Sequence, residues 1–218
     1  MAKLSWDDAS QKIYKNGLDK GVLFVRKADG TYDFGVPWYG LTGLTESPSG
    51  GEITRLYANN TEYGSIVSRE EFGGTIEAYY SPSEFDECDG TAELDTGVKV
   101  RQQTRKSFAL AYRSLLHSDA NPDLGYEIHL VYGCRITPSE VARATVGETE
   151  EADTMSWEFK STPVEVEGLK PTAHIVISSV EADPALLAYV EDSIYGTDTP
   201  DAEPFIPMPA DLITQINL

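Results

Sequence analysis

Histidine and cysteine are the side chains of this sequence best suited to chemistry, but they are few and far apart. The chain contains three histidines and two cysteines, whereas a zinc site needs several imidazole or thiolate ligands in one cluster. His129 and Cys134 are five residues apart on a predicted strand, which would put them on opposite faces. We therefore expect both to have packing roles, and we expect no metal and no cofactor.

The acidic segment DECDGTAELD (86–95) has only a superficial likeness to a calcium-binding loop. Gly90 lies one position early for an EF-hand, and Cys88 stands where an oxygen ligand is needed. A solvated acidic turn explains the segment better than metal binding. The adjacent acids Glu70 and Glu71 could in principle serve acid–base catalysis, yet neighbouring surface acids usually only solvate a loop.

Motifs for nucleotide binding and nucleophilic catalysis are absent from the sequence. It has neither a G-x-G-x-x-G pattern nor a P-loop to cradle a phosphate. It also lacks the G-x-S-x-G elbow that exposes a catalytic serine on a strained turn. The sequence therefore predicts that the protein is not an enzyme.

The charge of the chain excludes another class of function. Seventeen basic residues stand against 36 acidic ones, a formal net charge of −19. After Thr137 the only basic residues are Arg143, Lys160 and Lys170. Such an acidic surface repels phosphate, which argues against binding nucleic acid or an anionic membrane through a basic patch.

The N-terminal residues MAKLSWDDAS contain no apolar core of a secretory signal, and no stretch approaches the length needed to span a bilayer. We expect the product to stay in the cytoplasm where it is made, without a signal peptide. In that reducing compartment Cys88 and Cys134 are expected as buried thiols rather than as a disulfide.

The elements that would carry any function are predicted to be antiparallel strands. Asp29-Gly30 indicates a tight hairpin between the runs that flank it. Three later runs alternate apolar and polar residues, as half-buried strands do. The residues expected on one face of each run are Phe108, Leu110 and Tyr112; Tyr126, Ile128, Leu130, Tyr132, Cys134 and Ile136; and Met155, Trp157 and Phe159. The fold class predicted is mainly β, a sandwich or barrel with one flanking helix.

We expect the chain to form a single domain, 1–218. An N-terminal arm, 1–20, would contain a short helix or turn after Ser5. The β-sandwich would span 21–182, followed by a helix at 183–196 that begins at an Asp-Pro cap and ends at a glycine. The acidic, proline-rich residues 197–218 would form an extended tail that orders only against a partner.

A flexible loop is predicted between two short strand-like runs in the first third of the chain. It consists of polar and turn-forming residues and should project as a hairpin loop. Its members are Ser47, Pro48, Ser49, Gly50 and Gly51.

Several long segments, taken in order and spacing, point to a family. They are GVLFVRKADGTYDFGVPWYGLTGLTESPSGGEITRLYANN, EEFGGTIEAYYSPSEFDECDG, VRQQTRKSFALAYRSLL, GYEIHLVYG and MSWEFKSTPVEVEGLKPTAHIVISS. The sequence resembles the major tail proteins of siphophages, the phages with long non-contractile tails. The resemblance runs from about Val22 to Gly196.

The resemblance implies a tail-tube subunit, a virion protein without catalytic residues. Such subunits close into hexameric rings that stack into a tube, with a β-barrel lining the lumen. The implied partners are further copies of the chain, the tape-measure protein, the tail tip or initiator, and the tail terminator. Double-stranded DNA would pass through the tube into the host without specific binding.

Two sets of residues would then matter for assembly and conduction. The loop from Ser47 to Gly51 would contact the neighbouring ring. Glu77, Glu127 and Glu158 lie on the polar faces of predicted strands and are candidates for an acidic lumen, although plain solvent exposure explains each of them equally well. An acidic wall would avoid gripping DNA, which carries one phosphate per roughly 1.7 Å of duplex.

Two alternatives remain open. The first is a carbohydrate- or receptor-binding β-sandwich, in which a tryptophan stacks on a sugar. Trp157 alternates with core residues, so Trp38 is the better platform, although a structural role at a strand end is favoured for it. The second is a tube from a domesticated phage-like injection particle, which would share the fold and differ only in cargo.

Overall fold

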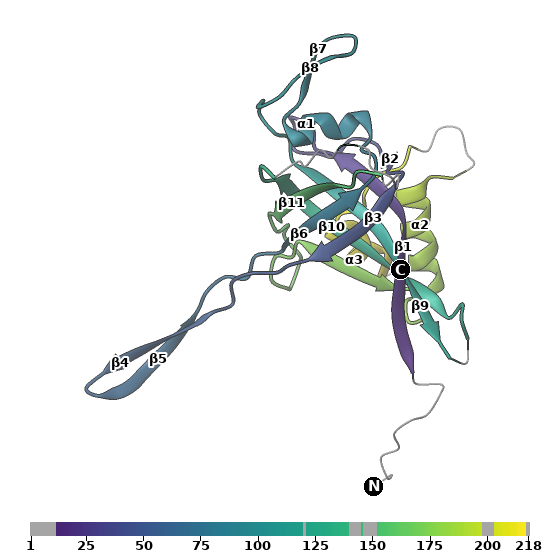
Figure 1. Cartoon of the computed structure of the whole chain (residues 1–218). Helices are drawn as coiled ribbons and strands as arrows, with labels where there is room; N and C mark the ends of the chain where they lie inside the picture. The colour runs from purple at the N-terminus through teal and green to yellow at the C-terminus, as the bar shows by residue number, and fades with distance from the viewer. Residues whose placement is uncertain (1–11, 120, 140–144, 146–151, 198–202, 217–218) are drawn as a thin grey trace.

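The structure is a computed structural model that describes residues 12–119, 121–139, 145, 152–197 and 203–216. Its fold is mainly β and antiparallel, as the sequence predicts (Figure 1). The elements are β1 (Ile13–Val25), β2 (Val36–Pro37), β3 (Leu41–Glu46), β4 (Ile53–Ala58), β5 (Thr61–Val67), β6 (Gly73–Ala78), the 3-10 turn η2 (Ser83–Phe85), α1 (Asp86–Asp89), β7 (Ala92–Asp95), β8 (Val98–Val100), β9 (Phe108–Ser118), β10 (Gly125–Ile136), β11 (Met155–Ser161), β12 (His174–Ser178), α2 (Pro184–Tyr195) and α3 (Pro209–Ile216).

The main sheet has the strand order β2-β1-β9-β10-β11-β6-β3. It curls on itself, so that β3, at one end of this order, also contacts β1. The strand β12 pairs with the first half of β10, while β11 pairs with its second half. Within the described residues, no helix is long and apolar enough to cross a membrane.

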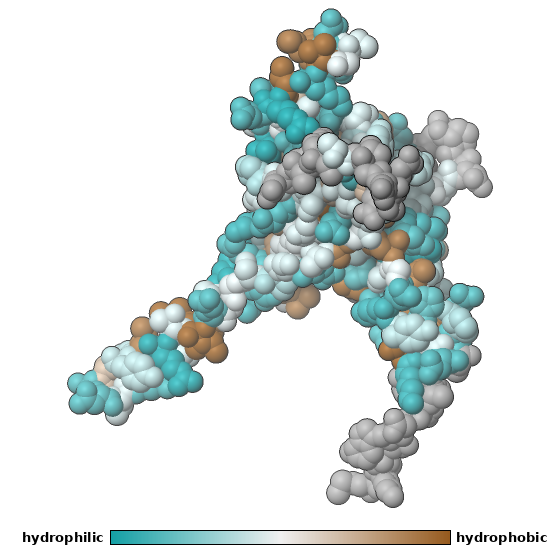
Figure 2. All heavy atoms as spheres, viewed as in Figure 1, coloured by the Kyte–Doolittle hydropathy of each residue, from teal (hydrophilic) through white to brown (hydrophobic). Residues whose placement is uncertain are grey.

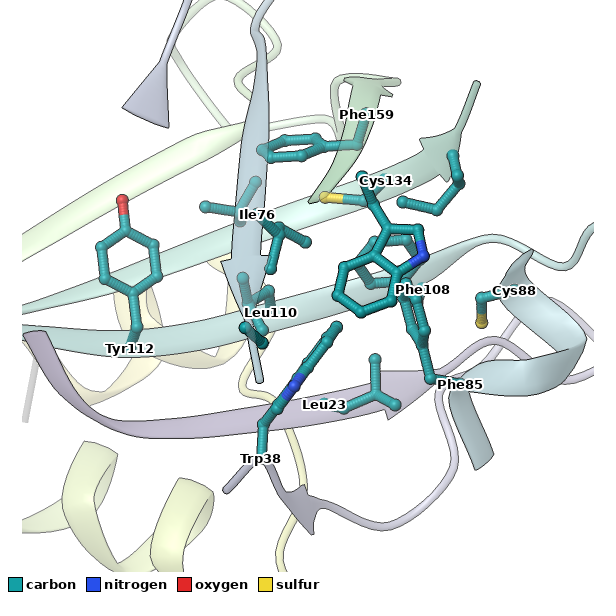
Figure 3. Packing of buried hydrophobic residues seen from close by; sticks show 14 residues of the cluster. Leu23, Trp38, Ile76, Phe85, Cys88, Phe108, Leu110, Tyr112, Cys134 and Phe159 are labelled. Carbon is teal, nitrogen blue, oxygen red and sulfur yellow. The ribbon is translucent and has the colours of Figure 1, made fainter. Parts of the chain in front are cut away.

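Two apolar clusters occupy the two faces of the curled sheet. The inner core lies on the concave face and is rich in aromatic rings (Figure 3). The outer core lies between the other face and the helices α2 and α3. Where β1, β9 and β10 have a cluster on each face, consecutive residues are buried instead of alternating with exposed ones. This holds for residues 21–24 of β1, 108–112 of β9 and 128–134 of β10.

The predicted faces are confirmed for two of the three alternating runs. Phe108, Leu110 and Tyr112 of β9 all point into the inner core, and so do Trp157 and Phe159 of β11. Met155 packs against the same cluster from its edge.

The predicted face of β10 is wrong beyond Tyr132. Gly133 has a φ of +61° and forms a bulge, where the pairing of β10 with β9 skips from Val131 to Cys134. A bulge of one residue moves all later side chains to the other face. Tyr132 therefore lies in the outer core and Cys134 in the inner core. His129, which stacks on Tyr112, shares the face of Cys134, so these two side chains do not lie on opposite faces as expected.

The helix predicted at 183–196 is confirmed as α2, and the predicted residues at its start and end have their expected roles. Asp183 caps the N-terminus: its Oδ1 accepts a hydrogen bond from the Ala185 amide at 2.8 Å, and Pro184 follows at the first helical position. The helix ends at Gly196, whose amide donates to the Asp192 carbonyl at 3.0 Å. Its apolar stripe packs into the outer core through Leu186, Leu187, Val190 and Ile194.

Replacing Asp183 with alanine is expected to lower the free energy of unfolding by about 1 kcal/mol, because the helix loses its side-chain cap. Equilibrium urea denaturation would measure the loss. The matched control is Glu181→Ala, which removes a nearby exposed carboxylate and leaves the cap intact. Equal losses in the two variants would contradict a capping role.

The expectation of an extended C-terminal tail is wrong for the described part. Ile206 and Leu212 are buried in the outer core, and residues 209–216 form the helix α3. The Tyr132 hydroxyl donates to the Pro207 carbonyl at 2.8 Å, and the Phe205 amide donates to the Ser193 carbonyl at 2.7 Å. The segment is thus ordered against its own chain rather than against a partner.

The prediction of an N-terminal arm at 1–20 is wrong from Ile13 onward. Residues 13–20, predicted as part of this arm, form the first part of β1, which pairs with β9 as far as Ser118. Ser5, Trp6 and the remainder of the expected helix lie outside the described residues.

Candidate functional site

The most prominent surface feature is an arm formed by the hairpin of β4 and β5, which extends far from the body (Figure 1). Its tip is a two-residue turn, Asn59-Asn60, with φ values of +51° and +63°. Two consecutive residues with positive φ form the turn type that matches the twist of a hairpin. The arm also carries an ion pair between Arg55 and Glu62, at 3.7 Å.

The arm exposes large aliphatic and aromatic side chains along its length, and Figure 2 shows the aliphatic ones as brown patches. Their exposed fractions range from 41% to 79%. An isolated two-stranded hairpin is at best marginally stable in water, and contiguous exposed apolar surface usually marks an interaction site. The residues are Ile53, Leu56, Tyr57, Tyr63, Ile66 and Val67.

The predicted projecting loop lies at the base of this arm, not at its tip. The amides of Ser49 and Glu71 each donate to the other residue's carbonyl at 2.8 Å, which joins the two sides of the base. The strands that flank the loop do not pair with each other, since β3 pairs with β6 and β4 with β5. Gly50 has a φ of +85°, and a Cβ there would lie 2.2 Å from the Arg69 carbonyl oxygen. The hairpin-loop prediction for Ser47, Pro48, Ser49, Gly50 and Gly51 is therefore wrong in position.

The three candidate lumen glutamates do not share one surface. Glu77 in β6 and Glu158 in β11 are exposed, and their strands are direct neighbours on the main sheet. Glu127 is different: its side chain is only 14% exposed and forms an ion pair with Lys15, at 2.6 Å. Glu127 thus lies at the rim of the inner core rather than on a polar strand face.

A polar cluster at that rim brings together residues from four strands of the main sheet. One nitrogen each from His129 and His174 and one carboxylate oxygen of Glu46 lie within 4.8 Å of one another. The Nδ1 of His129 and the Nε2 of His174 are hydrogen bonded at 3.0 Å. The Tyr112 hydroxyl donates to Glu46 Oε1 at 2.7 Å. We call Glu46, His129 and His174 the triad, with Tyr112 beside it.

Further contacts hold the two imidazoles in place. The Nε2 of His129 is hydrogen bonded to the Ser114 hydroxyl at 2.9 Å, and its ring stacks on Tyr112 with 4.5 Å between centroids. His174 packs against Phe72 at 4.7 Å. Burial, together with the neighbouring His174, lowers the pKa of His129 to about 4. Burial also lowers the pKa of His174. The low pKa of His129 keeps its ring neutral near pH 7.

The sequence does not predict this cluster, because its members are widely separated along the chain. The wide spacing of the histidines predicts no common site, but β10 and β12 pair directly, with Val131 opposite His174. The polar residues placed among apolar ones in β10 and β12 were the available signal, yet nothing in the sequence showed that the two strands are neighbours.

The other residues singled out from the sequence have structural roles here. Trp38 is buried, donates through Nε1 to the Tyr80 carbonyl at 2.8 Å, and packs against Phe85 and Trp157, so it offers no platform for a sugar. Cys88 and Cys134 are buried free thiols, as expected.

The acidic segment 86–95 is divided between α1 and β7. Asp86 forms an ion pair with Lys99, and Glu87 forms one with Lys106. Gly90 closes the helical turn with a φ of +76°. Asp86 and Glu87 are thus each paired with a lysine of a neighbouring segment.

Comparison with known proteins adds no relatives. No model of a known protein family matches the sequence, and a search of curated proteins finds no significant match.

Proposed function

We propose that this chain is the repeating subunit of a tail tube of the siphophage type, a hollow conduit built from stacked hexameric rings. The resemblance of its long segments to major tail proteins motivates the proposal. The apolar β4–β5 arm is the structural observation that carries it, because such an arm is costly in a monomer and useful in an assembly.

The arm provides a contact between successive copies of the chain. Its apolar residues lie on a hairpin that reaches beyond the body, so they cannot be covered by the two cores of the same subunit. Docking onto a neighbouring ring removes Tyr57, Tyr63 and Ile66 from water, at a gain of roughly 25 cal/mol per Å² of apolar surface buried. The base of the arm, at Ser47 to Gly51, then lies close to the ring junction.

The charge distribution suits a conduit for DNA. In the proposed tube, the exposed face that carries Glu77 and Glu158 lines the lumen, where carboxylates repel the phosphates of a passing duplex. Glu127 has no part in this wall, because it is covered and paired with Lys15. The tape-measure protein, the tip or initiator and the terminator are the remaining proposed partners.

Negative-stain electron microscopy of the purified chain, at high concentration and after long incubation in moderate salt, tests the proposal. The wild-type chain is expected to form rings or hollow tubes. The variant Tyr57→Ser/Tyr63→Ser/Ile66→Ser is expected to remain monomeric with an unchanged circular dichroism spectrum, since these side chains pack against no core of their own subunit.

The matched control replaces three exposed apolar residues away from the arm, Tyr39→Ser/Leu169→Ser/Val180→Ser. This control should assemble like the wild type. Assembly of the arm variant at the wild-type level would contradict the role of the arm. A wild-type chain that stays monomeric but binds a glycan array would favour a carbohydrate-binding module instead.

A further inference from the structure

The triad has the composition of a metal site. It supplies two imidazoles and one carboxylate, a donor set that suits zinc and related divalent transition ions. Each donor comes from a different strand: Glu46 from the end of β3, His129 from β10 and His174 from β12. The three donors are therefore held by the main sheet and not by loops.

The distances within the triad fit a small ion. Two ligands at about 2.0 Å from a tetrahedral ion are about 3.3 Å apart. The two imidazole nitrogens are separated by 3.0 Å, and Glu46 Oε1 lies 3.8 Å from the Nδ1 of His129. Glu46 Oε2 lies 3.8 Å from the Nδ1 of His174, which is the ring nitrogen not bonded to His129, and the three donor atoms of the triad lie within 4.8 Å of one another. The Glu46 side chain must therefore rotate towards the two rings for all three donors to reach one ion. An ion would take the place of the proton that the two rings share.

Surrounding contacts orient the ligands in the way that metal sites require. Ligating histidines usually have their second nitrogen hydrogen bonded, which fixes the ring and its tautomer. Ser114 does this for His129, and it leaves the Nδ1 atom facing the triad. The Tyr112 hydroxyl holds one oxygen of Glu46. Aromatic rings flank both histidines.

One side of the triad is open. The side chain of Glu46 is 39% exposed, whereas those of His129 and His174 are 9% and 15% exposed. An ion can enter past the carboxylate, and a water molecule can complete a four-coordinate shell from the same side.

We propose that Glu46, His129 and His174 bind a divalent transition-metal ion, with zinc as the expected occupant. The ion ties the end of β3 to β10 and β12. Because residue 47 begins the base of the arm, the bound ion fixes the point from which the arm departs. The site does not depend on the proposed function, since it requires only the fold of a single chain.

Cobalt(II) titration of the tag-free, chelator-treated full-length chain tests the proposal. Tetrahedral cobalt absorbs visible light, so binding is read directly. We expect one cobalt per chain, displaced by one equivalent of zinc, and a rise in the thermal unfolding midpoint when either ion is added. His174→Gln and Glu46→Gln should each weaken cobalt binding by at least about tenfold while retaining the wild-type circular dichroism spectrum.

Two controls make the result specific. His117→Gln removes the remaining histidine, which stacks on Tyr14 away from the triad, and Glu77→Gln removes an exposed carboxylate from β6. Both should bind cobalt as the wild type does. Absence of a cobalt spectrum in the wild type would overturn the proposal, and so would a spectrum that survives in both triad variants. Glu46 is the more exposed ligand, so Glu46→Gln remains decisive if His174→Gln fails to fold.

Discussion

Replacing Phe85 with alanine is expected to lower the free energy of unfolding by about 3–5 kcal/mol, the usual cost of deleting a buried phenylalanine. The ring of Phe85 is buried at the centre of the aromatic group in the inner core. Its centroid lies 4.6 Å from that of Trp38, 5.2 Å from Trp157 and 5.5 Å from Phe108. A chain of this size should lose roughly 2–4 °C of melting temperature per kcal/mol.

The control for Phe85 is another phenylalanine that lies at the surface. Phe34 is half exposed, so Phe34→Ala should cost less than about 1 kcal/mol. Urea denaturation followed by tryptophan fluorescence and by circular dichroism would measure both variants. Equal losses at the two positions would mean that the inner core is not packed as described.

The second large effect is expected at Gly133. A Cβ at this position would lie 2.4 Å from the carbonyl oxygen and 3.1 Å from the amide nitrogen of Thr162, and neither backbone atom can easily move. The positive φ adds a penalty of roughly 1–2 kcal/mol for any residue with a side chain. Gly133→Ala should therefore lower the free energy of unfolding by about 2–4 kcal/mol.

Two other glycines allow the cost of the clash with Thr162 and the cost of the positive φ to be measured separately. Gly168 also has a positive φ, +76°, but a Cβ there would meet nothing within 4 Å, so Gly168→Ala should show the conformational penalty alone. Gly64 has neither feature, and Gly64→Ala should be neutral or slightly stabilising. A Gly133→Ala variant no less stable than Gly168→Ala would show that the clash with Thr162 is relieved at little cost.

Local signals account for the parts of the fold that the sequence predicts correctly. The alternation around Phe108 and Trp157 and the cap at Asp183 each depend on a few neighbouring residues. The bulge at Gly133 could not be predicted in this way. Both faces of β10 are buried, so its apolar run is compatible with either register, and only the change of partner from β12 to β11 reveals where the strand must shift.

The arm could be predicted from the sequence, whereas the triad could not. Asn59-Asn60 is a hairpin signal between two runs that contain exposed aromatic residues. Pro48, Gly50 and Gly51 are a stronger turn signal than Asn59-Asn60. For this reason the sequence predicts the loop at 47–51, which the structure places at the base of the arm. The triad spans residues 46 to 174, and its members meet only because the sheet curls and β12 pairs with β10.

The burial of both cysteines makes this chain convenient for thiol-directed labelling. Cys88 and Cys134 are almost entirely inaccessible, and burial raises the pKa of the Cys88 thiol to about 12. Neither thiol should react with a maleimide while the chain is folded, because the thiolate is the reactive form. A cysteine introduced at the tip of the arm would thus carry a single fluorophore, with no need to remove the native cysteines and disturb the inner core.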